Sequence, residues 1–316
     1  MADKTTKPLL TLGTIRRQYA TDEACKGLLK SLRWPEKVAC PRCNASEKVY
    51  SMEKSKPFHW KCKSCNKDGY RFSVLTGTVF ENTNVPLRTW FEVAFLMVSS
   101  KKGISALQVH RMIDPVRGAK GSYKTAWYMC HRLRAAMQEG GFFQLAGVVE
   151  IDEAYVGGDA TNAHRGNRGK NTKATPGRRG NLVPPKVGVV GAIARKGNVV
   201  AKVIGSLDAP TIKSFVRRVV SDKTAMVATD GFETYSDLKS KFGMPHESVD
   251  HVHGEYVRGQ VHTQTIESFW SLLKRGIMGS FHHVSAEHLP LYLNEFSFRH
   301  NHRHDPDIFR AVIAGC

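Results

Sequence analysis

Residues 147–158, GVVEIDEAYVGG, place a carboxylate inside an apolar stretch. The apolar residues and the closing glycine pair predict a buried β-strand that carries Asp152. A buried, unpaired carboxylate is energetically costly, so an acid in such a strand is usually a metal ligand, a catalytic group or half of an ion pair. Glu150 and Glu153 flank it, and we interpret both as lying on the opposite face of the strand or at its edge, where they either support the residues of the site or are solvated. The rest of the chain should therefore supply partners for Asp152.

The second candidate acid ends another predicted strand. Residues 187–197 and 198–207 predict two strands, residues 209–222 a helix, and residues 224–235 a strand that ends at Asp230. With the first strand this gives the order β-β-β-α-β of an RNase H-like fold. Acids on adjacent strands of that fold can share a metal ion.

The third candidate acid, Glu267, opens a predicted amphipathic helix within residues 262–281. The apolar face of this helix consists of Ile266, Phe269, Trp270, Leu273 and Ile277. Lys274 lies two turns after Glu267 on the same face, about 10 Å along the axis. Most helix glutamates are simply solvated, but this one follows two acid-bearing strands, so we predict that it joins their site.

Positive charge is concentrated in the first half of the chain. Of a formal net charge of +19 over 316 residues, +14 falls in residues 1–146, which hold 25 Lys and Arg against 11 Asp and Glu. This distribution predicts a polyanionic partner. No apolar run approaches the roughly 18 residues of a membrane span, and the N-terminus lacks the apolar core of a signal peptide. We therefore expect a cytoplasmic protein without a membrane partner.

Four of the seven cysteines form two close pairs in the basic half. Cys40 and Cys43 are separated by 18 residues from Cys62 and Cys65. This spacing is typical of a four-cysteine site for structural Zn²⁺, and the short alternating segments around it predict a zinc ribbon. Lysines beside aromatic residues favour contact with nucleic acid, although a ribbon that binds no DNA is the alternative.

The segment after the ribbon predicts a helix-turn-helix. Residues 87–100 predict an apolar core helix, and residues 104–113 and 122–137 a pair of shorter helices. Basic and aromatic residues on the second of these favour DNA binding, although helix pairs occur in any α-helical domain. Its buried stripe should consist of Ala126, Cys130, Leu133 and Met137. Its predicted DNA contacts are Lys124, Tyr128, His131 and Arg132.

Residues 157–186 are rich in Gly, Asn, Lys and Arg and have no apolar period. They predict a mobile basic loop directly after the acid-bearing strand. A solvated surface loop is one interpretation; its position favours a role in holding the DNA backbone. The contacts that we predict there are Arg165, Arg168, Arg178 and Arg179.

Together these patterns predict an α/β protein. An RNase H-like catalytic domain, with a mixed sheet flanked by helices, should follow a zinc ribbon and a helical helix-turn-helix domain. The expected boundaries are residues 1–35 for an N-terminal helical segment, 36–84 for the ribbon, 85–140 for the helix-turn-helix domain and 145–305 for the catalytic domain, with the basic insertion at 157–186.

The joint occurrence of several motifs resembles the DDE-type transposases of bacterial and archaeal insertion sequences, those with an N-terminal zinc ribbon and an ISXO-like catalytic domain. The motifs are RWPEKVACPRC, CKSC, GYRFSVLTGT, GSYKTAWYMCHRLR, EIDEAYVGG, ATDGFETY, HTQTIESFWSLLKRG and YLNEFSFRHNHR. The resemblance implies that Asp152, Asp230 and Glu267 are the catalytic acids and that Lys274 contacts DNA near the reacting end. It also implies binding of terminal inverted repeats, metal-dependent strand cleavage and strand transfer into target DNA.

Such chemistry suits the residue types. Hard carboxylate oxygens can hold two Mg²⁺ ions, or Mn²⁺ in their place, that activate the nucleophile and neutralise charge at phosphorus. We expect Asp152 to bridge both ions, with Asp230 and Glu267 each binding one. Because transposition joins two ends, we expect at least a homodimer on double-stranded DNA. We expect the protein at the nucleoid of a prokaryotic cell. The alternatives are a DNA-binding regulator and a nuclease of the same fold that cuts without joining.

Overall fold

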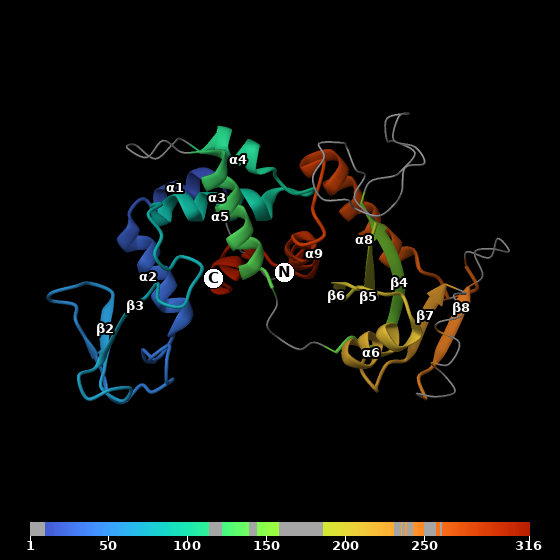
Figure 1. Cartoon of the computed structure of the whole chain (residues 1–316), viewed down its shortest axis with the longest axis horizontal. Coiled ribbons are helices and arrows are strands. Elements are labelled where there is room, and N and C mark those ends of the chain that lie inside the picture. The colour runs from blue at the N-terminus through green and yellow to red at the C-terminus, as the bar shows by residue number, and fades with distance from the viewer. Residues whose placement is uncertain are drawn as a thin grey trace, which may run out of the picture. The chain divides into compact units, whose positions relative to one another are not determined.

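The computed structural model describes residues 10–113, 122–138, 144–157, 186–230, 235, 238, 243–249, 257–259 and 261–316. The chain divides into two compact units, residues 1–138 with 302–316, and residues 139–301 (Figure 1). Within the described part, no helix combines the length and apolar character needed to cross a bilayer. The arginines predicted to bind DNA from the basic insertion lie outside the described residues, so their role stays a prediction.

Helices pack around α3 in the first unit. Its helices are α1 (Leu12–Gln18), α2 (Asp22–Arg33), α3 (Leu87–Ser99), α4 (Ala106–Met112), α5 (Tyr123–Ala136) and α10 (Ile308–Ala314). As predicted, α3 is a core helix, because Trp90 and Phe91 are completely buried. The ring of Phe309 from α10 lies 5.6 Å from that of Phe91, so the last residues of the chain complete this core.

The predicted helix pair corresponds to α4 and α5. Each begins at a serine whose hydroxyl accepts a backbone N–H one turn on, Ser105 from Gln108 and Ser122 from Thr125. The predicted buried stripe of α5 is confirmed, since all four of its residues are at most 6% exposed. The segment that joins the two helices, residues 114–121, is outside the described residues.

The ribbon consists of three short antiparallel strands in the order β1-β2-β3. They are β1 (Val49–Ser51), β2 (His59–Cys62) and β3 (Tyr70–Ser73). Trp60 is buried, and its ring lies 5.2 Å from that of Trp34 and 5.9 Å from that of Phe72. This aromatic side chain therefore belongs to the small core of the ribbon and does not form part of a surface for stacking on bases.

The second unit contains a mixed five-stranded sheet in the order β6-β5-β4-β7-β8. Its strands are β4 (Val148–Val156), β5 (Val187–Ala194), β6 (Val199–Val203), β7 (Met226–Asp230) and β8 (His246–Val249). The first three strands form an antiparallel meander, and β7 returns through α6 (Ala209–Val219) to pair parallel with β4. The predicted β-β-β-α-β order is thus confirmed, and β8 extends the sheet by one strand that the sequence did not reveal.

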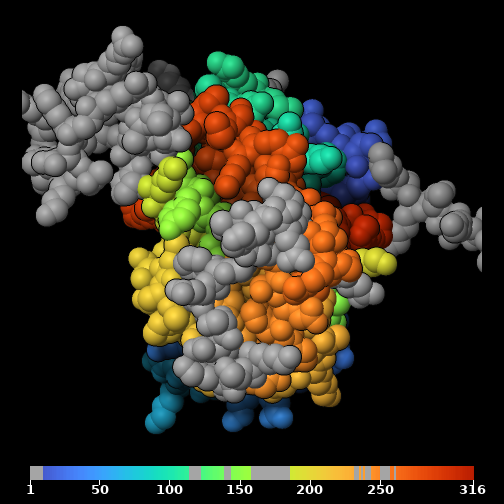
Figure 2. All heavy atoms as spheres, turned by 90° about the vertical axis from the view of Figure 1, so that its right-hand side faces the viewer, coloured from blue at the N-terminus to red at the C-terminus, as the bar shows by residue number. Residues whose placement is uncertain are grey.

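Alternate residues of β4 pack on opposite faces of this sheet. Val149 and Ile151 pack into a core with α6, whereas Ala154 and Val156 pack into a core with α8 (Gln264–Gly276) and α9 (Leu289–Asn301). Between these two helices lies a π-helical segment, Ile277–Phe281. Figure 2 looks onto the side of this unit where the light green segment that contains β4 and orange to red-orange segments that follow β7 reach the surface.

This alternation corrects one of our predictions. Glu150 is two residues from Asp152 on β4, so both side chains point to the same face, the one covered by α8. Glu150 is also completely buried, and its carboxylate contacts the start of α8. It is therefore neither solvated nor on the face opposite Asp152.

Candidate metal centres

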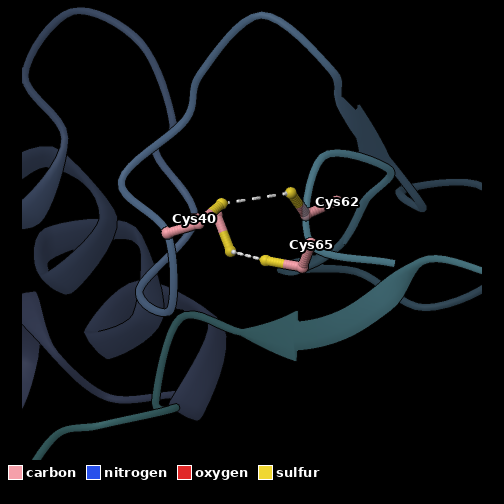
Figure 3. A group of neighbouring side chains, drawn as sticks. Cys40, Cys62 and Cys65 are labelled. Carbon is pink, nitrogen blue, oxygen red and sulfur yellow. Dashed lines mark hydrogen bonds between the residues drawn. The ribbon is translucent and has the colours of Figure 1, made fainter. Parts of the chain in front are cut away.

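Four sulfur atoms converge in the ribbon. Sγ of Cys40 lies 3.5 Å from Sγ of Cys65, and Sγ of Cys43 lies 3.7 Å from Sγ of Cys62 (Figure 3). A tetrahedral zinc ion with Zn–S distances of about 2.3 Å separates its ligand sulfurs by about 3.8 Å. The two pairs of cysteines therefore fit a structural Zn²⁺ held by all four thiolates.

The pKa of Cys62 also suits a zinc ligand. Burial opposes ionisation of this thiol, but hydrogen bonds from the backbone N–H groups of Cys65 and Ser64 and from neighbouring thiols outweigh it and lower the pKa to about 7. A thiolate is the form that binds the metal. In the same cluster the pKa of Cys65 is raised, first by its hydrogen bond with Cys43 and then by burial, so the thiols of this site differ in how readily they ionise.

A second cluster is formed by carboxylates of the sheet. Asp152 lies within β4, and Asp230 is the last residue of β7. Because Ile151 pairs with Thr229 in the parallel register, the two acids are the next residues along the two neighbouring strands. One oxygen from each of Asp152, Glu153 and Asp230 lies within 4.8 Å of the other two. Oxygen donors at this spacing are what Mg²⁺ and similar hard cations require.

Burial raises the pKa values of two of these carboxylates, and neighbouring charges add to the effect. Burial raises the pKa of Asp152 to about 6, reinforced by Asp230 and, to a smaller extent, by Glu267. Burial likewise raises the pKa of Glu153 to about 7, with Asp230 and Asp152 acting in the same direction. A divalent cation would remove this repulsion, so the cluster fits a divalent metal better than it fits three bare carboxylates.

Glu153 is held from the other side of the cluster. The hydroxyl of Tyr235 donates a short hydrogen bond to Glu153 Oε1, and this bond lowers the pKa of Glu153 against the larger effect of burial. Tyr235 is 1% exposed, and burial followed by the Glu153 charge raises the pKa of its phenol, so it stays a donor. The sequence did not identify Glu153 as part of the cluster, since strand alternation alone points it away from Asp152.

Glu267, the third predicted acid, lies on α8 and is not one of the three acids whose oxygens meet within 4.8 Å. It lies in the first turn of α8, where Thr263 donates a hydrogen bond of 2.6 Å to Glu267 Oε1. Its side chain is exposed, and its charge acts on Asp152. Lys274 is exposed on the same helix, two turns further on. The predicted apolar face of α8 is confirmed, because all five of its residues are at most 7% exposed.

The predicted DNA contacts of α5 fall into two groups. Lys124 and Tyr128 are exposed, and Arg132 is partly exposed, with its guanidinium donating to the hydroxyl of Tyr128 and to the carbonyl of Thr78. His131 is 8% exposed, and its ring lies 4.0 Å from that of Trp127. Burial of this imidazole corrects our prediction for His131, which packs inside the unit and is not placed to contact DNA.

Comparison with known proteins gives three matches. An ISXO2-like transposase domain matches residues 144–301, and a transposase zinc-ribbon domain matches residues 20–68. The chain is also 31% identical, over 287 residues, to a protein in transposable element ISH50 of Halobacterium salinarum. That alignment covers 90% of this chain and 92% of the relative. The first match spans β4 to α9, and the second spans all four cysteines.

Proposed function

Because this chain belongs to the family of ISXO2-like transposases, we propose that it binds the terminal inverted repeats of an insertion sequence, cuts the DNA there and transfers the strand into target DNA. The observation that carries the proposal is the meeting of Asp152 and Asp230 on adjacent strands.

The proposed site consists of Asp152, Asp230 and Glu267. Mg²⁺ ions bound there, or Mn²⁺ in their place, would activate water or a 3′-hydroxyl and neutralise charge at phosphorus. Asp152 is central, because Asp230 and Glu267 both act on its charge. Glu153 lies in the same cluster as Asp152 and accepts a hydrogen bond from Tyr235, and we propose that it supports this set. Lys274, exposed on the helix that carries Glu267, is proposed to contact a DNA phosphate near the reacting end.

DNA binding is proposed to rest mainly on the first half of the chain. The exposed residues Lys124 and Tyr128, with Arg132, are the proposed contacts from α5, and the basic insertion with Arg165, Arg168, Arg178 and Arg179 is proposed to hold the backbone. Affinity for double-stranded DNA should then fall steeply as salt concentration rises, since each phosphate contact releases counterions. Joining two ends would require at least a dimer, assembled on DNA at the nucleoid.

The test is an assay of cleavage and joining on DNA that carries the repeats flanking the gene, with Mg²⁺ present. Asp152→Asn should lower cleavage by about 1000-fold or more, equivalent to about 4 kcal/mol, and leave DNA affinity unchanged. Glu247→Gln, an exposed acid on β8, is the matched control and should cleave like the wild type. Undiminished cleavage by Asp152→Asn would reject the site.

The same assay separates the alternatives. Supplying pre-cut ends and target DNA should give joined product if the protein is a transposase. Cleavage without joined product would identify a nuclease of the same fold. Binding of DNA with neither reaction would identify a regulator.

A further inference from the structure

Glu150 is the most completely enclosed acid near the proposed site. Its side chain is 0% exposed, and both oxygens of its carboxylate accept hydrogen bonds from the protein. Oε2 accepts the backbone N–H of Thr265 at 2.7 Å and that of Ile266 at 3.1 Å. Oε1 accepts the hydroxyl of Thr265 at 2.9 Å and Nε of Arg195 at 2.7 Å. A buried carboxylate with this many donors is held in one orientation.

These contacts make Glu150 the cap of α8. The first turn of a helix presents backbone N–H groups without partners inside the helix, and a negative charge is favourable there. The residue before α8, Thr263, does not cap the helix with its side chain, because its hydroxyl donates to Glu267. Glu150 supplies the cap from a strand 115 positions earlier in the chain.

Arg195 ties the same carboxylate to a third segment. Its backbone N–H bonds to the carbonyl of Val148 at the start of β4, and its guanidinium donates both to Glu150 and to the carbonyl of His262 just before α8. Glu150 and Arg195 therefore bind both the first turn of α8 and the residue His262 just before it to β4, the strand that carries Asp152.

One turn further along α8, the helix is seated on the strand beside Asp152. Gly191 of β5 pairs with Asp152, and the ring of Trp270 packs directly on it. A Cβ atom at position 191 would lie 2.6 Å from Cζ2 of Trp270, so only glycine permits this approach. The indole Nε1 makes no hydrogen bond of normal geometry among the described residues, but it is close enough to Asp152 to oppose the rise in the pKa of that acid.

We propose that Glu150 is a positioning residue for the transposase reaction: by capping α8 from β4, it fixes where Glu267 stands relative to Asp152. The inference rests on the proposed roles of Asp152 and Glu267. It adds that Glu150 sets the position of Glu267 without itself touching DNA or metal. Glu150 and Asp152 point to the same face of β4, so one strand holds both the first acid and the clamp for the third.

The rival interpretation is that Glu150 and Arg195 are a buried ion pair that only stabilises the second unit. Both interpretations predict a lower melting temperature when Glu150 is changed. They differ in where the protein loosens and in whether the effect depends on Glu267.

The first measurement is amide hydrogen exchange of the full, zinc-loaded chain without DNA or Mg²⁺. Glu150→Gln should raise exchange in the first turn of α8, residues 264–267, by about tenfold or more, while β5 and β6 keep their protection. Val149→Ala is the matched control, because this completely buried neighbour faces the α6 side of the sheet. The control should leave the first turn of α8 protected. Equal loosening of the whole unit in both variants would overturn the proposal.

The second measurement is a double-mutant cycle of single-turnover cleavage, carried out below the melting temperature of every variant. Glu150→Gln should slow cleavage by about 10-fold to 100-fold, and Val149→Ala should not slow it. If Glu150 acts through Glu267, the double variant Glu150→Gln, Glu267→Gln should match Glu267→Gln alone to within about twofold. Losses that multiply would overturn the proposal, since they would show that the two residues act independently.

The two measurements separate failure of this inference from failure of the proposed function. Wild-type cleavage by Glu267→Gln would reject the catalytic role of that acid, and with it the effect of Glu150 on the reaction. Selective loosening of α8 in Glu150→Gln would then still support the clamp, because exchange is measured without DNA or Mg²⁺. An unchanged first turn of α8 would reject the clamp whatever the cleavage rates are.

Discussion

The four cysteines of the ribbon come from two short turns, with two residues between the members of each pair, whereas the carboxylates of the sheet come from positions 152, 153 and 230. In the ribbon, hydrogen bonds between the thiols and from the backbone lower the pKa of Cys62 and raise that of Cys65. In the sheet, burial and mutual repulsion raise the pKa values of Asp152 and Glu153. The four cysteines of the first site fit a structural ion that stabilises the ribbon. The second site brings together buried acids whose ionisation costs free energy, and a bound cation would offset that cost.

The largest expected effect concerns the ribbon. Cys43→Ser removes one exposed thiolate and should abolish zinc binding, whose free energy is on the order of 10 kcal/mol in small zinc domains. Loss of the ion should unfold β1 to β3, measured as fast amide exchange there and as less than one zinc per chain. The exposed neighbour Ser64→Ala should keep its zinc. If the ribbon stayed folded without zinc, the prediction would be wrong, and the aromatic core around Trp60 would be sufficient to keep β1 to β3 folded.

The second largest expected effect is on the cleavage rate, and it shows which glutamate completes the carboxylate site. Glu267→Gln should slow cleavage on the order of 1000-fold, about 4 kcal/mol, because it removes a proposed ligand of the catalytic metal. Glu153→Gln should slow it about 10-fold, because Glu153 is already engaged by Tyr235 and supports the neighbouring acids. Single-turnover cleavage at saturating Mg²⁺ measures both. If Glu153→Gln slowed cleavage more than Glu267→Gln, Glu153 would be the metal ligand and Glu267 the supporting residue.

The smallest effect is a dependence of stability on pH. Folding raises the pKa of Asp152 from 3.8 to about 6, so between these values the folded chain binds more protons than the unfolded chain. The folded state is therefore destabilised as pH rises through this window. Without Mg²⁺, wild type and Asp152→Asn should differ little at pH 4. At pH 7 the wild type should be less stable by at most about 3 kcal/mol.

Thermal unfolding of both proteins at several pH values measures this difference. Adding Mg²⁺ at pH 7 should stabilise the wild type and leave Asp152→Asn almost unchanged. If the difference in the free energy of unfolding between the two proteins stayed constant from pH 4 to pH 7, ionisation of Asp152 would not destabilise the folded state.

The contrast between the two sites explains what could be predicted from the sequence. The ribbon depends on close spacing, so the two cysteine pairs, Cys40 with Cys43 and Cys62 with Cys65, were enough to predict it. The strands around Asp152 and the apolar face of α8 were predicted from periodicity, which reports burial directly. The order of strands and helices then indicated that Asp152 and Asp230 are neighbours, and the register confirms that β4 and β7 are adjacent and parallel.

What could not be predicted depends on contacts between distant segments. Glu153 enters the cluster because Tyr235 holds its carboxylate, and Glu150 is buried because the start of α8 and Arg195 supply donors. Strand alternation, correctly applied, places Glu150 on the face of Asp152, but it cannot identify the helix that covers this face. His131 was expected on a face of α5 away from the predicted buried stripe, yet it is buried and its ring packs on Trp127.

We propose that Asp152 organises a divalent metal site that is separate from the zinc of the ribbon. Titration of the zinc-loaded protein with Mn²⁺, followed by the paramagnetic signal of the free ion, tests it most directly. We predict Mn²⁺ binding by the wild type, its loss in Asp152→Asn and an unchanged zinc content in both proteins. Equal Mn²⁺ binding by the two proteins, or Mn²⁺ binding that is lost in Cys43→Ser while Asp152 is intact, would contradict the account.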